Sequence, residues 1–105
     1  MEEKITNQLQ YFVIIGNTKL RKQFSALLKE NGAHSIETIY GRGSVGKSIL
    51  AQAFGLDSSQ KRAIISCLLV AENAKKVIDV LYKEYKFNKA NTGIAFSVPI
   101  EKLSF

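Results

Sequence analysis

The chain has 105 residues, of which 46% are hydrophobic and 23% are charged. This length and composition predict one globular domain spanning residues 1–105 and argue against a disordered or fibrous protein. No apolar run approaches the about 20 residues that a membrane-spanning helix needs, so a transmembrane segment is excluded. The polar start MEEKITNQLQ predicts that no signal peptide is present.

The cysteine count and the net charge indicate the compartment and the kinds of partner that the protein can have. The single cysteine, Cys67, has no partner for an internal disulfide, which favours a reducing cytoplasm. With one cysteine and one histidine, a structural zinc site within one chain is not expected. The net charge of +6 comes largely from dispersed lysines, which are typical of a solvated surface. Nucleic acid is therefore not an expected partner, whereas a small anionic ligand fits.

The first part of the chain predicts a strand, a helix and a second strand. QYFVIIG (10–16) is apolar and rich in β-branched and aromatic residues, as strands are. In residues 17–32 the apolar side chains recur at helical spacing, and Asn17 or Thr18 can cap the start of the helix. HSIETIYG (34–41) alternates apolar and polar side chains, which predicts the second strand.

The remainder predicts a strand, a helix and a strand after an irregular stretch. RAIISCLLV (62–70) is almost wholly apolar and forms the third predicted strand. AENAKKVIDVLYKEY (71–85) has the periodicity of an amphipathic helix, and GIAFSVPI (93–100) is the fourth predicted strand. Residues 41–62 are rich in glycine and polar side chains and predict a loop.

This order predicts a ferredoxin-like α+β fold, βαββαβ, with four mainly antiparallel strands and both helices on one face. Two helices cover only one face of a four-stranded sheet, yet the strands 10–16 and 62–70 carry apolar side chains on both faces. A strand with one solvated face should alternate instead. The sequence therefore predicts that another copy of the chain covers the second face in a closed, symmetric assembly.

The string GRGSVGKS (41–48) matches the phosphate-loop pattern G-x-x-x-x-G-K-[S/T] and raises the alternative of a nucleotide-hydrolysing enzyme. That chemistry also requires a magnesium-binding carboxylate from another strand. The next strand offers only Glu72, which follows the strand at the start of the second helix, and the loop lacks a crossover helix of adequate length. We therefore expect no enzyme and no catalytic residues, and interpret the glycines as a mobile loop whose backbone can bind phosphate.

A second alternative is an RNA-binding module, because other βαββαβ proteins stack bases on aromatic side chains of the sheet. The strand segment AIISCLLV (63–70) lacks the basic and aromatic residues that such a surface needs, which disfavours this class.

The element order, the glycine-rich exit ETIYGRGS (37–44) and the segment NTGIAFSVPI (91–100) together resemble the PII signal-transduction family, particularly its divergent PII-like branch. The resemblance covers nearly the whole chain. It implies a compact homotrimer whose sheets face inward, with adenine nucleotides such as ATP, ADP or AMP bound between subunits. It also implies a T-loop, here residues 42–61, that contacts a target protein, and a regulatory role linked to nitrogen control.

By position, the resemblance implies that the ligand contacts the start of the T-loop and the turn before the fourth strand. The implied ligand-binding residues, with two loop cations added, are Gly41, Arg42, Gly43, Ser44, Lys47, Asn91, Thr92 and Gly93.

Two cations of the family site are missing from this sequence. Ile94 occupies the position of the family's phosphate-binding lysine, and IEKLSF (100–105) contains no arginine. Arg42, Lys47 or Lys89 could replace them, and a different small ligand is the open alternative.

Overall fold

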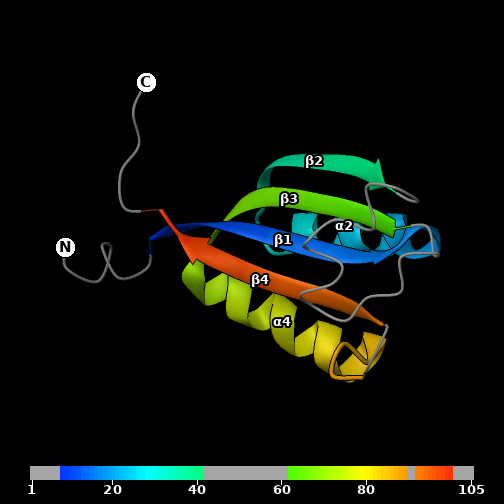
Figure 1. Cartoon of the computed structure of the whole chain (residues 1–105). Helices are drawn as coiled ribbons and strands as arrows, with labels where there is room; N and C mark the ends of the chain where they lie inside the picture. Colours follow the sequence, from blue (N-terminus) through cyan, green and yellow to red (C-terminus); the bar gives the residue numbers. More distant parts are fainter. Residues whose placement is uncertain (1–7, 42–61, 90–91, 101–105) are drawn as a thin grey trace.

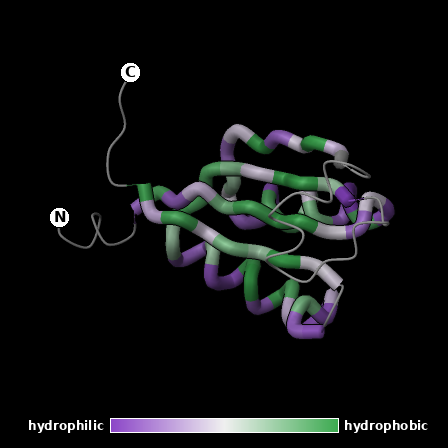
Figure 2. Tube along the Cα trace, viewed as in Figure 1, coloured by the Kyte–Doolittle hydropathy of each residue, from purple (hydrophilic) through white to green (hydrophobic). Residues whose placement is uncertain are grey.

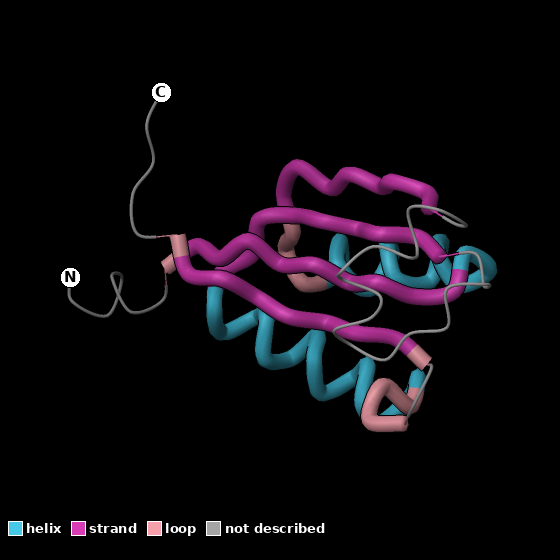
Figure 3. Tube along the Cα trace, viewed as in Figure 1, coloured by secondary structure: helices cyan, strands magenta, loops and turns pink. Residues whose placement is uncertain are grey.

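The computed structural model describes residues 8–41, 62–89 and 92–100, which form a four-stranded sheet packed against helices (Figure 1). The elements in chain order are β1 (Leu9–Asn17), η1 (Thr18–Leu20), α2 (Arg21–Glu30), β2 (His34–Gly41), β3 (Arg62–Val70), α4 (Ala71–Tyr85) and β4 (Gly93–Pro99). The strands lie in the order β2-β3-β1-β4, and every neighbouring pair is antiparallel. The predicted ferredoxin-like βαββαβ fold is confirmed, with both helices on the same side of the sheet (Figure 3).

The first helix differs from its prediction at the start. A continuous helix was expected over residues 17–32, but a 3-10 turn precedes α2. The side chain of Asn17 accepts a hydrogen bond from the backbone N–H of Lys19 at 2.9 Å. Asn17 therefore caps the 3-10 turn rather than the α-helix, because this short-range bond closes a tighter turn before the α-helical pattern begins.

The end of α4 directs the chain back towards the core. Lys86 adopts the left-handed conformation, with φ 60° and ψ 37°. The turn lets the backbone N–H of Phe87 donate to the carbonyl of Leu81 at 3.1 Å. The Phe87 side chain is 8% exposed and meets the ring of Phe24 edge-on, with centroids 5.7 Å apart. This aromatic contact holds the start of the connection to β4 against α2.

The core lies between the sheet and the two helices. Its buried side chains come from alternate positions on the strands, from one face of each helix and from the turn after α4. They are Phe12, Ile14, Phe24, Leu28, Ile65, Cys67, Leu69, Ala74, Val77, Leu81 and Phe87. The uniform apolar content of this layer explains why the sequence periodicity located the elements well.

The opposite side of the sheet, which we call the helix-free face, is also apolar. In the registers given by the strand pairing, its side chains are those of Leu9, Tyr11, Val13, Ile15, Asn17, Glu37, Ile39, Arg62, Ile64, Ser66, Leu68, Val70, Ile94, Phe96 and Val98. Figure 2 shows hydrophobic residues running along the strands while hydrophilic residues gather on the helices. The predicted two-faced apolar sheet is therefore present.

Exposure on the helix-free face is uneven. Val13 and Ile15 on the central strand β1 are only 5% and 3% exposed. Tyr11, Ile39 and Val98 are 44%, 59% and 47% exposed. The exposed apolar area of this face is therefore concentrated towards the strand ends and the β2 edge.

The thiol of Cys67 gives the stability of the fold a defined pH dependence. Burial raises the pKa of Cys67 from 9.0 to about 11 because the thiolate is poorly solvated in the core. Deprotonation of the unfolded chain then precedes that of the folded chain. The contribution of this group to stability is complete below pH about 9 and is lost as the pH rises towards 11.

We expect the difference in unfolding free energy between the wild type and Cys67→Ala to decrease between pH 9 and pH 11. Urea unfolding at a series of pH values measures this difference. The tyrosines and lysines are the same in both proteins, so their contributions to the pH dependence drop out of it. A difference that stays constant across this range would contradict the assigned pKa shift.

Candidate functional site

Four strand ends meet at one end of the sheet. Arg62, the first residue of β3, pairs with Asn17 at the end of β1 and with Gly41 at the end of β2. Gly93, the first residue of β4, pairs with Gly16 one position further into the sheet. We call Gly41, Arg62 and Asn17 the strand-end row. The predicted ligand-binding segment that begins at Gly41 continues from this row, and the turn before β4 leads into Gly93 at the same end of the sheet.

The structure describes three of the predicted ligand-binding residues. Gly41 ends β2, Thr92 lies half-buried in the turn before β4, and Gly93 is buried at the start of β4. Lys89, a proposed replacement cation, is exposed in the connection that follows α4. The other five predicted residues lie outside the described residues: Arg42, Gly43, Ser44, Lys47 and Asn91.

One chain does not bring Gly41 and Gly93 together. Gly41 belongs to β2 and Gly93 to β4, which are the two edge strands of the sheet. Three strand spacings separate them, a distance of about 14 Å. A small ligand that contacts both Gly41 and Gly93 must therefore lie between two copies of the chain or span most of this end of the sheet.

Gly93 has a packing reason to be glycine, independent of any ligand. A Cβ atom at this position would lie 2.6 Å from Cζ of Phe87 and 2.9 Å from the backbone oxygen of Ile15. At its partner Gly16, a Cβ atom would lie 2.7 Å from Cε2 of Phe24. The paired glycines leave room for the two aromatic rings beneath them, so the turn that enters β4 rests directly on the core.

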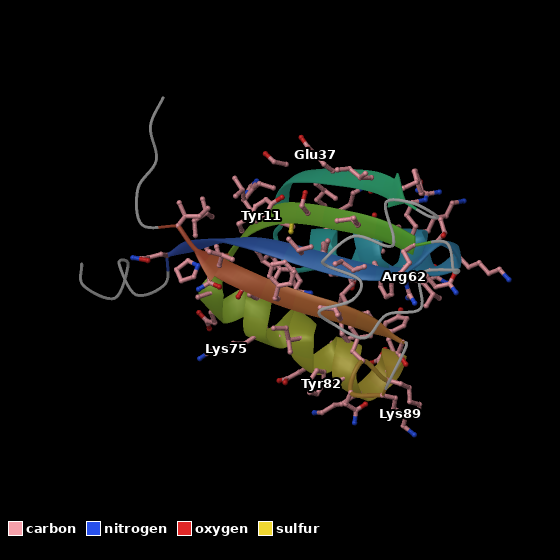
Figure 4. The ribbon with its side chains drawn as sticks, viewed as in Figure 1. Tyr11, Glu37, Arg62, Lys75, Tyr82 and Lys89 are labelled. Carbon is pink, nitrogen blue, oxygen red and sulfur yellow. The ribbon has the colours of Figure 1, made fainter. Side chains whose placement is uncertain are left out.

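Arg62 is a strand-end residue that the sequence analysis did not select. It is only 8% exposed and its position in β3 directs it to the helix-free face. Within the four described strands it is the sole lysine or arginine. Figure 4 shows Arg62 at the end of the sheet where β3 begins, well away from Tyr11 and Glu37. The available signal was a cation at the first position of an otherwise apolar strand.

The phosphate-loop alternative gains no support from Glu72. This residue is exposed and lies in the first turn of α4, where an acidic side chain favours the helix dipole. Within the described ranges, no group of three or more His, Cys, Asp or Glu side chains is arranged to hold a metal ion. Neither described α-helix is long and apolar enough to cross a membrane.

Comparison of the sequence with protein-family models finds no match, and comparison with curated proteins also finds none. Solved structures, however, match most of the fold. A PII-like signaling protein from Thermus thermophilus is 21% identical, with a TM-score of 0.64 over 88% of this chain and 86% of that chain.

Two further structures have the same arrangement at lower identity. CPII from Thiomonas intermedia, bound to ADP, AMP and acetate, is 16% identical with a TM-score of 0.65, covering 88% of this chain and 85% of that chain. A DUF3240 family protein from Shewanella baltica is 14% identical with a TM-score of 0.58, covering 93% of this chain and 96% of that chain. The strand order, the helix packing and these similarities show that the chain has the fold of the PII-like signalling proteins.

Proposed function

We propose that this protein is a homotrimeric ligand sensor in which each ligand lies between two neighbouring copies. The ligand is a small anion, with the adenine nucleotides ATP, ADP and AMP as the first candidates. Segment 42–61, which joins β2 to β3, contacts a target protein. The sensor acts by regulating that target and catalyses no reaction itself, and a role in nitrogen control belongs to the same proposal.

The observation that carries this proposal is the position of Gly41 and Gly93 at the same end of the sheet but on opposite edges. The pairings make β2 and β4 antiparallel to each other. When the β2 edge of one copy lies beside the β4 edge of the next, Gly41 and the neighbour's Gly93 meet at the same end. Repeating this contact around a closed ring creates one shared site at every junction.

The helix-free face supports an assembly of this kind. Its side chains are mostly apolar, and Tyr11, Ile39 and Val98 remain about half exposed in the single chain. Exposed apolar area of this sort is characteristic of surfaces that contact another protein. In a ring with the sheets facing inward, these side chains are removed from water and the lysine-bearing helices form the exterior.

The ligand class follows from chemistry at the strand ends and from the structural similarity. Backbone N–H groups of glycine-containing turns bind phosphate well, and both predicted segments contain glycine. CPII, which has this fold, is bound to both ADP and AMP in some of its structures. These two facts make adenine nucleotides the first ligands to test.

Signalling requires that the ligand interact differently with two states of the protein. A ligand held at the end of β2 favours those conformations of segment 42–61 that contact it, and the target protein distinguishes them from the others. The buried free thiol of Cys67 suits a reducing compartment, so we assign this activity to the cytoplasm.

Native mass spectrometry of the purified chain tests assembly and ligand together. We expect a complex of about 35 kDa, three times the chain mass of 11.7 kDa, that binds up to one nucleotide per chain. ATP, ADP, AMP, adenosine, bicarbonate and acetate are the ligands to compare. Adenosine controls for recognition of the base without phosphate.

A chain that remains a monomer at micromolar concentration with every ligand would refute the shared site. A trimer that binds none of these compounds would refute the ligand assignment but leave the assembly intact.

A further inference from the structure

Tyr40 is a largely exposed aromatic residue near the end of the edge strand β2. Its register partner on β3 is Ala63, which in turn pairs with Gly16 on β1. A Cβ atom at Gly16 would meet the ring of Phe24 on α2, so these paired positions lie on the helical side of the sheet. Tyr40 is therefore on the helical side, whereas the adjacent Ile39 is on the helix-free face.

The helices cover the helical side of β2 less and less towards the end of the strand, which is the edge of the sheet in Figure 1. Ile36 packs against the core, Thr38 is half-buried, and Tyr40 is 58% exposed. The edge-on contacts that Phe24 makes with other rings do not include Tyr40. The Tyr40 ring therefore adds little to the core, and much of its surface is open to a ligand.

The position of Tyr40 places it beside the proposed ligand site. It immediately precedes Gly41, where that site begins. In the proposed ring of copies the helix-free faces point inward, so Ile39 faces the interior and Tyr40 faces the outer side of the junction. Gly93 of the neighbouring copy is also at a helical-side position, because it pairs with Gly16. Tyr40 and the neighbour's Gly93 thus flank the junction on its outer side.

The chemistry of an exposed tyrosine beside a glycine fits a ligand with a flat base. Glycine backbone N–H groups can bind phosphate but offer nothing to an aromatic base. A tyrosine ring provides a flat, rigid surface at a small cost in conformational entropy, and nucleic-acid bases stack on such rings. The proposed ligand segments contain glycines and polar residues, so Tyr40 supplies the aromatic partner that they lack.

We propose that Tyr40 stacks on the base of a nucleotide whose phosphates lie near Gly41 and the neighbour's Gly93. This inference rests on the proposed function, because it assumes that a ligand binds where β2 ends. It specifies the ligand as a compound that carries an aromatic base, in preference to a small inorganic anion, and it assigns recognition of the base to the edge strand.

Isothermal titration of the full-length protein with AMP and with ribose 5-phosphate tests the assignment, because AMP is ribose 5-phosphate that carries adenine. Tyr40→Ala should weaken AMP binding by about 5- to 150-fold, the loss typical of removing one base-stacking ring, and should change ribose 5-phosphate binding by less than about twofold. Tyr40→Phe keeps the ring and should bind AMP within about twofold of the wild type. Tyr82→Ala removes a ring of similar exposure from α4 and should leave AMP binding unchanged.

Fluorescence gives a second readout that does not depend on the alanine variant. The chain contains no tryptophan, so Tyr40→Trp introduces a single indole at this position. Stacking of adenine on the indole should quench its emission when AMP binds, whereas ribose 5-phosphate should leave it unchanged. Tyr82→Trp is the matched control, and its emission should respond to neither compound.

Three results would each overturn the stacking role: wild-type AMP affinity in Tyr40→Ala, equal losses in Tyr40→Phe and Tyr40→Ala, or AMP binding to Tyr40→Trp without quenching. A wild type that binds ribose 5-phosphate as tightly as AMP would also overturn it, while the small-anion ligand of the proposed function would stand. A wild type that binds neither compound would instead refute the nucleotide ligand of the proposed function, and this inference with it.

Discussion

Replacement of Phe24 by alanine is expected to lower the free energy of unfolding by about 3–5 kcal/mol, the range for deleting a fully buried aromatic side chain. Phe24 is 0% exposed. Its ring packs edge-on against Tyr85, with centroids 5.2 Å apart, and against Phe87 at 5.7 Å. The substitution leaves a cavity between α2, the end of α4 and β1, and it removes both aromatic contacts.

Urea unfolding at one fixed protein concentration measures this effect, because the proposed assembly would make the stability depend on concentration. Tyr82→Ala is the matched control, since Tyr82 is an aromatic residue of α4 that is 55% exposed. Its change should stay within about 0.5 kcal/mol. Equal losses for the two variants would mean that Phe24 does not anchor the core.

A glutamate at Ile39 is expected to convert the proposed trimer to monomers at micromolar concentration. Ile39 is 59% exposed on the helix-free face of the edge strand β2. In the single chain a charge at this position stays solvated and costs little. Within an interface between sheets, the same carboxylate would be buried without a partner, and this penalty falls on association alone.

Sedimentation or light scattering measures the mass of Ile39→Glu and of Tyr82→Glu. The comparison shows whether the helix-free face or the helical side forms the contact. Tyr82 has a similar exposure, 55%, but lies on α4, so its variant should keep the wild-type mass. Far-UV circular dichroism of both variants controls for folding. An Ile39→Glu protein that assembles like the wild type would show that the helix-free face is not the contact surface.

Local sequence patterns were sufficient for most of the fold. The predicted limits of β2, β3 and α4 agree with the structure because apolar periodicity and buried packing coincide there. The first helix was mispredicted at its start, since the Asn17 side chain can cap either a 3-10 turn or an α-helix. Periodicity carries no information about which of these hydrogen bonds forms.

The arrangement of the candidate site was harder to predict from the sequence than the fold was. Glycine-rich strings made Gly41 and Gly93 candidate residues, but their separation across the sheet depends on the strand order, which arises from long-range pairing. Arg62 did not stand out in the sequence, because one cation at the start of an apolar strand resembles an ordinary boundary residue. Its burial and its register with Gly41 became evident only from the folded arrangement.

The close packing of Gly93 against the Phe87 ring limits which substitutions this position can accept. Any side chain larger than hydrogen at Gly93 would clash with Phe87 and with the backbone of β1. A substitution at this position would therefore disturb the packing of the core. Variation at the proposed ligand site would then have to come from positions other than Gly93, such as Thr92 in the turn before β4.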